Sequence, residues 1–166
     1  MNWLYPVIGL VALQRLAELL WSRRNERRLR AAGGVETGHG HYPFFVVLHT
    51  AWLAAQLLFI APETVPDPIL IGVYAALQGL RIWTVASLGR FWTTRILTLP
   101  GAPLVRRGPY RWIRHPNYAI VIAEIALLPL AFGAVAIALI FSAANLILLT
   151  VRIRAEEAVL APRRTL

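Results

Sequence analysis

The run YAIVIAEIALLPLAFGAVAIALIFSAANLILLTV occupies residues 118–151 and decides how the chain folds. A membrane-spanning helix needs about 20 apolar residues, so this run is too long for one span and slightly short for two. Gly133 lies at its middle, shortly after Pro129, and both residue types interrupt helices. We therefore predict a tight helical hairpin of 118–131 and 134–151. The alternative is one kinked, strongly tilted helix.

Three further apolar segments precede this run, at about 3–21, 43–61 and 68–88. The chain of 166 residues is 58% apolar, above the roughly 45–50% of soluble domains. We therefore predict one all-α domain, a polytopic integral membrane protein with about five transmembrane helices. The first segment has neither a basic region before it nor a clear cleavage site, so we interpret it as a retained span.

The charged residues predict the orientation of these spans. All 17 basic residues are arginines, and the net charge is +9. They cluster after the first, third and last spans, whereas the link at 61–67 has none. By the positive-inside rule the N-terminus lies outside and the C-terminus inside. The arginines are then expected to interact with the lipid bilayer, and no nucleic-acid partner is expected. The oligomeric state stays open.

Polar residues inside the spans gather at one depth. At ~1.5 Å per residue they lie within roughly 10 Å of the cytoplasmic interface, and such residues mark a cavity by default. They are Arg15, Glu18, His49, Arg81, Glu124 and Asn145. We predict a wet pocket open to the cytosol, with interhelical hydrogen bonds and snorkelling arginines as the alternative. The candidate substrate-binding residues are Glu18, His49, Trp52, Arg81 and, from the next loop, Trp92.

The loop at 89–117 is predicted to be an ordered, irregular cytoplasmic structure, because its prolines and glycines preclude a continuous helix. Its aromatic residues also fit a plain interfacial belt. Asn117 and Tyr118 open the fourth span directly after Pro116, so backbone N–H groups at a helix start face the cytosol and suit a carboxylate. Arg114 and His115 stand beside them.

The segment VRIRAEEAVL follows the last span and begins the predicted cytoplasmic tail at 152–166. Its acidic pair beside arginines is compatible with a solvated helix end. Alternatively, the acidic pair holds ribose hydroxyls or balances a ligand cation. Cysteine is absent, which excludes disulfides, thiolate metal sites and a cysteine nucleophile. No metal is expected.

Two motifs together resemble the isoprenylcysteine carboxyl methyltransferase family. They are Arg114-His115-Pro116-Asn117-Tyr118 and, after an intramembrane Glu124 and a hairpin, Arg154-Ala155-Glu156-Glu157. This resemblance covers about 88–160. The segments at 15–43 and 99–112 resemble the bacterial branch that O-methylates alkylpyrones and alkylresorcinols, which implies the inner membrane as the location.

The resemblance implies that S-adenosylmethionine (SAM) is the cofactor, and the chain has no glycine-rich GxGxxG loop. The candidate cofactor-binding residues are His115, Pro116, Asn117, Tyr118, Arg152, Glu156 and Glu157. The candidate catalytic residues are Arg114, Arg154 and Glu124. Aromatic faces attract a sulfonium, with Tyr118 the first candidate and Trp92 the second. The base is open among His115, Glu124 and Glu18, or an arginine stabilises the acceptor oxyanion instead.

The expected function is SAM-dependent O-methylation of a lipophilic acceptor, a small ring hydroxyl carrying a long alkyl or isoprenoid chain. Protein carboxyl methylation is the less expected reaction, because the chain stops soon after Leu160 without the longer tail of the eukaryotic prenylcysteine enzymes. A membrane reductase using NADPH is a rival, since sterol reductases resemble the same C-terminal architecture. The other rival interpretation is a lipid-binding membrane protein without enzymatic activity.

Overall fold

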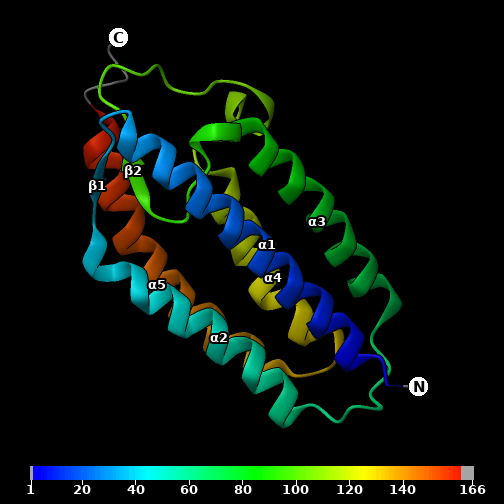
Figure 1. The fold of residues 1–166 in the computed structure, drawn as a ribbon. Helices are drawn as coiled ribbons and strands as arrows, with labels where there is room; N and C mark the ends of the chain where they lie inside the picture. Colours follow the sequence, from blue (N-terminus) through cyan, green and yellow to red (C-terminus); the bar gives the residue numbers. More distant parts are fainter. Residues whose placement is uncertain (1, 162–166) are drawn as a thin grey trace.

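The computed structural model describes residues 2–161 as a bundle of five helices, which confirms the predicted fold class (Figure 1). Four of these helices are long and apolar enough to cross a membrane, and α4 is a shorter apolar helix. The start of α1 and the end of α5 lie at opposite ends of the bundle (Figure 1). The helices are α1 (Leu4–Ala31), α2 (Tyr42–Phe59), α3 (Pro68–Leu88), α4 (Pro116–Ala131) and α5 (Val135–Leu160).

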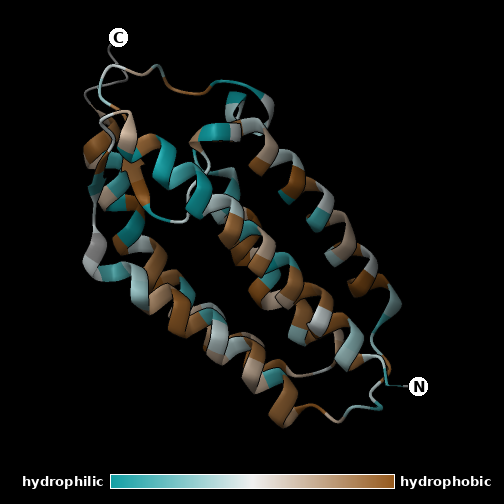
Figure 2. Cartoon of the chain, viewed as in Figure 1, coloured by the Kyte–Doolittle hydropathy of each residue, from teal (hydrophilic) through white to brown (hydrophobic). Residues whose placement is uncertain are grey.

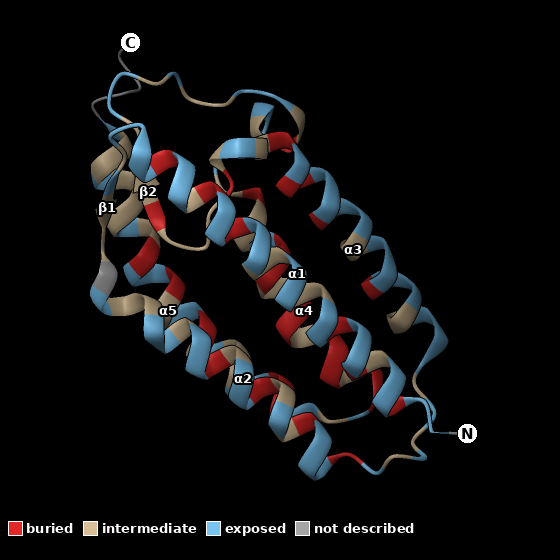
Figure 3. Ribbon diagram, viewed as in Figure 1, coloured by how far each residue is buried: buried red, intermediate tan, exposed pale blue. Residues whose placement is uncertain are grey.

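The outer surface of the bundle carries many exposed apolar side chains. Large apolar side chains such as Leu10, Leu58 and Ile147 are exposed, and the exposed strips of α1, α2 and α3 in Figure 3 carry many of the hydrophobic residues of Figure 2. The interior is closed by residues such as Trp52 and Leu128. An apolar exterior of this extent marks contact with a membrane rather than with water.

The predicted C-terminal hairpin is confirmed. α4 ends at Ala131, and α5 begins at Val135. Gly133 turns the chain with a left-handed φ of 72°, and its N–H donates to the Leu130 carbonyl at 2.9 Å. A glycine with positive φ after the last helical residue is the common way to end a helix, so the two helices are distinct and antiparallel.

Two helices extend beyond the apolar segments. α1 continues past the predicted limit at residue 21, because Ser22, Asn25 and Leu29 are buried at helical spacing along its polar second half. α5 continues to Leu160, so the first part of the predicted tail is helical, and residues 162–166 lie outside the described part. α4 begins at Pro116, whose fixed φ suits the first turn of a helix.

The α3–α4 loop is ordered, as predicted, and it contains the 3-10 turns η2 (Gly89–Phe91) and η3 (Gly108–Arg111). It also forms a small sheet that the sequence did not predict. Strand β1 (Val35–Thr37), from the α1–α2 link, pairs antiparallel with β2 (Ile96–Thr98). The links after α1 and α3 are therefore joined at one end of the bundle (Figure 1). We call it the arginine-rich end, because the segments 23–30, 90–114 and 152–154 there carry most of the arginines.

Glu36 fastens this sheet through two arginines. Its Oε1 accepts from Arg95 Nη1 at 2.7 Å, and its Oε2 accepts from Arg30. Burial opposes ionisation, but the two guanidinium groups outweigh it and hold the pKa of Glu36 below its ordinary value. A lowered pKa stabilises the fold above the ordinary glutamate pKa of about 4.3 and ceases to do so as pH falls through the lowered value.

We expect Glu36→Gln to lower the thermal unfolding midpoint at pH 7, and we expect the difference from the unsubstituted protein to shrink towards pH 3. Thermal unfolding of the two proteins in one neutral detergent at both pH values measures this. A difference of equal size at pH 3 would show that the carboxylate charge does not fasten the sheet.

Candidate functional site

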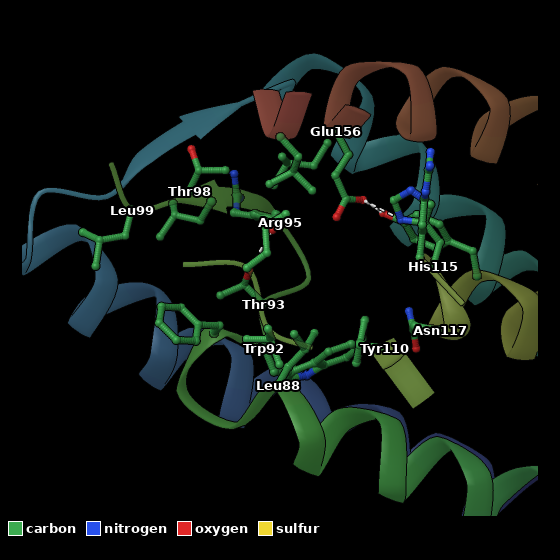
Figure 4. Close-up of a pocket in the computed structure, with 18 of the residues that line it drawn as sticks. Leu88, Trp92, Thr93, Arg95, Thr98, Leu99, Tyr110, His115, Asn117 and Glu156 are labelled. Atoms are coloured by element: carbon green, nitrogen blue, oxygen red, sulfur yellow. Dashed lines mark hydrogen bonds and ion pairs between the residues drawn. The ribbon is translucent and has the colours of Figure 1, made fainter. Parts of the chain in front are cut away.

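A cavity of about 400 Å³ lies at the arginine-rich end of the bundle. The loop from η2 through β2 forms one wall, and the start of α4 and the end of α5 form another. Figure 4 shows Arg95, Thr93 and Trp92 on the loop side and Glu156 and His115 across from them. The charged and polar side chains of its α4 and α5 wall are Arg114, His115, Asn117, Tyr118, Arg152 and Glu156.

The two sequence motifs meet beside this cavity. His115 Nε2 lies 2.6 Å from Glu157 Oε1, and the Tyr118 hydroxyl donates to Glu156. The rings of His115 and Tyr118 stack, with centroids 5.3 Å apart and an interplanar angle of 21°. These contacts join the first turn of α4 to the end of α5, although their residues are some forty positions apart in sequence.

Arg152 connects this pair of helices to the loop. Its Nε donates to the Tyr118 hydroxyl at 2.8 Å, and its Nη2 donates to the Thr94 carbonyl at 2.8 Å. Its guanidinium also lies 5.4 Å from the centroid of the Phe45 ring on α2. A buried arginine with this many partners fixes the geometry of the surrounding walls.

The loop wall is in turn held by α1. Ser22 Oγ accepts from Thr94 N–H at 2.8 Å, and Asn25 Nδ2 donates to the Gly89 and Trp92 carbonyls at 2.9 Å each. These contacts explain why the polar second half of α1 stays helical. It supports the segment that carries Trp92 and Arg95 into the cavity wall.

Two polar atoms of the cavity residues are buried without a hydrogen-bond partner among the described residues. They are Asn117 Oδ1, an acceptor, and Trp92 Nε1, a donor. A buried polar group without a partner costs about 1–3 kcal/mol, so native structures rarely leave one unless something else satisfies it. The two atoms therefore suit a ligand that offers both a donor and an acceptor.

Tyr110, from η3, lines the same cavity. Burial, together with the nearby Glu156 carboxylate, raises the pKa of its phenol above the ordinary value. The hydroxyl therefore stays protonated at neutral pH and is available as a hydrogen-bond donor.

Most of the predicted site residues fall into two groups. The cavity group contains Trp92, Arg114, His115, Asn117, Tyr118, Arg152 and Glu156, which line the cavity. Glu157 supports it through His115, and Pro116 is buried at the start of α4. Arg154 is exposed on α5 and does not line the cavity.

The second group lies inside the bundle and forms an ion-pair network. Arg81 Nε and Nη2 donate to the two carboxylate oxygens of Glu18 at 2.6 Å each, and its Nη1 donates to Glu124 Oε2 at 3.0 Å. Arg15 Nη2 donates to the same oxygen at 2.7 Å. Gln78 Nε2 donates to Glu124 Oε1 at 2.9 Å. Two arginines and two glutamates thus balance in charge, joining α1, α3 and α4.

His49 and Trp52 are engaged elsewhere in the bundle. His49 Nδ1 lies 2.8 Å from the Phe45 carbonyl, and Trp52 Nε1 donates to the Ile125 carbonyl at 3.2 Å. Neither these two nor the ion-pair network lines the cavity. Asn145 is fully buried on α5. The catalytic and substrate-binding roles of the residues inside the bundle stay predictions.

Sequence reasoning did not single out Arg95, Thr93 and Tyr110, which all line the cavity. The alternation of apolar and threonine residues around Ile96 is a weak strand signal, and a strand there would have brought Arg95 towards the α1–α2 link. Nothing in the sequence indicated the partner strand.

The fold and the cavity define a polytopic membrane protein with a cavity between the ends of its helices. A model described as the isoprenylcysteine carboxyl methyltransferase family matches residues 70–162. The chain therefore belongs to this family of SAM-dependent methyltransferases. The matched segment contains every residue that lines the cavity.

Two curated relatives extend the similarity over nearly the whole chain. The "Uncharacterized protein YpbQ" of Bacillus subtilis (strain 168) is 40% identical over 163 residues, 95% of each chain. An "Uncharacterized protein" of Haemophilus influenzae is 28% identical over 156 residues, 89% of this chain and 88% of its own. No solved structure matches.

Proposed function

We propose that the protein transfers a methyl group from SAM to a lipophilic acceptor, and that SAM binds in the cavity between the α3–α4 loop and the ends of α4 and α5. The observation that carries this proposal is the meeting of the two family motifs beside the cavity, through His115 and Glu157 and through Tyr118 and Glu156. Family membership supports the reaction class.

The residues present fit SAM. The cavity volume of about 400 Å³ lies within the roughly 300–1,000 Å³ usual for small-ligand sites. Arg95 and Arg114 suit the carboxylate of its methionine part, and Glu156 suits its ammonium or ribose hydroxyls. The unpartnered Asn117 Oδ1 and Trp92 Nε1 offer the acceptor and the donor that adenine needs.

SAM, when bound, supplies a methyl group on a positively charged sulfonium. Attack on such a methyl is an in-line displacement, so the protein contributes mainly by positioning and by excluding water. The Tyr118 ring is fixed by its hydroxyl, which donates to Glu156 and accepts from Arg152. Aromatic rings attract cations, and the Arg152 guanidinium already lies 5.8 Å from the centroid of this ring. The sulfonium would therefore approach the part of the ring that His115 and Arg152 leave open.

His115 is the residue that we propose receives the acceptor's proton. With Nε2–H donating to Glu157, the imidazole has its lone pair at Nδ1, which lies 3.8 Å from Glu156 Oε2 on the cavity wall. A histidine oriented by a carboxylate is a common general base. Its position on the cavity wall allows it to serve an acceptor hydroxyl there.

The proposed acceptor is a small ring hydroxyl on a long alkyl or isoprenoid chain. The cavity has apolar residues beside its charged ones, among them Leu88, Leu104 and Leu160. The surface of the bundle is broadly apolar, so an acceptor dissolved in the bilayer would reach the cavity laterally, from within the membrane. Carboxyl methylation of a prenylcysteine is the second candidate, and family membership is the observation that favours it.

Labelled methyl transfer tests this proposal. Purified protein in nanodiscs with methyl-labelled SAM should label a long-chain alkylresorcinol or alkylpyrone, and a farnesylated cysteine peptide should be a poor substrate. If only the peptide were labelled, the acceptor would be a prenylcysteine carboxylate and not a ring hydroxyl. Oxidation of NADPH with no labelled lipid would contradict methyl transfer itself.

We further propose that the arginine-rich end, with the cavity, faces the cytoplasm and that the N-terminus lies outside. The end of α1, the α3–α4 loop and the end of α5, which carry most of the arginines, lie at one end of the bundle (Figure 1), and cytoplasmic ends carry the excess of arginine. A C-terminal alkaline phosphatase fusion should be inactive, and a C-terminal fluorescent protein should fold. An active phosphatase fusion would reverse the orientation.

A further inference from the structure

A second hollow adjoins the cofactor cavity at the end of α3. Its volume is about 610 Å³, and three arginines line it: Arg90, Arg106 and Arg107. The rest of its lining is apolar, and these apolar residues, like Arg106, also line the cofactor cavity, so the two hollows share one wall. Positive charge beside apolar surface is the combination that a lipid with an anionic headgroup would match.

The three arginines of this hollow make no ion pair with any carboxylate in the described part of the chain. Other arginines behave differently, since Arg30 and Arg95 both pair with Glu36. Uncompensated charges in one place repel each other, and an anion between them removes the repulsion. The hollow therefore has the charge of an anion site.

Two of the guanidinium groups are held in place by the protein. Arg107 Nε donates to the Ser87 carbonyl at 2.7 Å, and Arg90 lies 4.9 Å from the centroid of the Phe91 ring. The terminal nitrogens of Arg107 do not take part in the bond to Ser87, so they remain available to a ligand. Side chains that are already ordered lose little entropy when they bind.

Aromatic residues place the hollow at the depth of lipid headgroups. Trp83 on α3 and Trp112 after η3 form an edge-to-face pair with centroids 6.2 Å apart, and they are 49% and 70% exposed. Tryptophan side chains of this kind lie at the membrane–water interface. A Cβ at Gly108 would approach Ser87 Oγ to 2.0 Å, so the arginine-bearing segment sits directly on the end of α3.

We propose that this hollow binds the phosphate group of an anionic membrane lipid. Guanidinium groups bind phosphate through paired, charge-assisted hydrogen bonds, and the apolar lining accommodates the start of an acyl chain. Binding of this lipid does not depend on methyl transfer.

Native mass spectrometry of the protein released from nanodiscs tests the proposal. With equal phosphatidylglycerol and phosphatidylcholine present, we expect phosphatidylglycerol to be retained preferentially. The R90Q/R106Q/R107Q protein should lose roughly tenfold or more of this preference. The matched control is R23Q/R24Q/R28Q, which removes the same charge from exposed positions on α1. If both triple variants lost the phosphatidylglycerol preference equally, the preference would come from general attraction between positive charge and anionic lipid. That result would overturn the proposed site.

Two further arms complete the test. The R90Q/R106Q protein keeps the Arg107–Ser87 bond and should still lose most of the preference, which guards against misfolding of the triple variant. Inorganic phosphate is added in a parallel titration. If phosphate alone protected the protein from thermal unfolding, and R90Q/R106Q lost this protection, the hollow would still be a phosphate site. Its ligand would then be a soluble phosphate compound and not a lipid. No lipid preference and no phosphate effect in the unsubstituted protein would refute the proposal.

Discussion

Replacing Glu124 by glutamine is expected to destabilise the helix bundle by about 3–5 kcal/mol, because breaking a buried ion pair leaves its partner charges uncompensated. Glu124 is 1% exposed and accepts hydrogen bonds from both Arg15 and Arg81. Without its charge, the buried guanidinium of Arg81 and the partly buried one of Arg15 share the single carboxylate of Glu18. The loss should appear as a much lower thermal unfolding midpoint in detergent.

The double variant E124Q/R81Q provides the internal control for this expectation. It leaves Arg15 and Glu18, whose groups lie 3.2 Å apart, so the charges balance again and part of the lost stability should return. E63Q, at an exposed position in the α2–α3 link, should leave the midpoint unchanged. An E124Q protein as stable as the unsubstituted one but inactive in methyl transfer would instead make Glu124 a chemical participant.

The second large effect is expected at Glu156. The E156Q protein should bind SAM roughly ten- to a hundredfold more weakly, since hydrogen bonds to charged groups contribute about 1.5–3 kcal/mol. Its carboxylate lines the cavity and fixes the Tyr118 hydroxyl. Isothermal titration with SAM in detergent measures the change. The matched control is T150V, at an exposed position on the same helix.

An E156Q protein that binds SAM as tightly as the T150V control would contradict the placement of SAM against α5. The thermal unfolding midpoint of E156Q should stay close to that of the control, which separates loss of the ligand from loss of the fold. Transfer of labelled methyl at saturating SAM should partly recover, because the substitution weakens binding without removing the proposed base, His115.

Much of the fold was predictable because its signals are local. Span length, the arginine clusters and the Gly133 turn each depend on a few neighbouring residues. The continuation of α1 depends on Ser22, Asn25 and Leu29 packing against a loop far along the chain. The β1–β2 sheet has three residues in each strand, too short for a periodic pattern to stand out.

The candidate site was predictable in part, for a similar reason. Contiguous motif residues such as His115 and Tyr118 share one helix start, so one motif locates them together. Depth along a span was a weaker guide for Glu18 and Arg81, because it does not give the rotation of a helix about its axis. The structure turns those two side chains towards each other, away from the cavity. Arg95 required knowledge of the strand that pairs with β2.

Photo-crosslinking of radiolabelled SAM, with the labelled peptides mapped by mass spectrometry, tests the central claim most directly. Ultraviolet irradiation attaches SAM to the side chains that it touches, and aromatic residues on both cavity walls are available for this, Trp92 and Tyr118 among them. We expect label in peptides from 91–118 and 152–160, and its loss when excess unlabelled SAM is present. Specific label confined to α1 or α2, or no label that SAM displaces, would contradict the account.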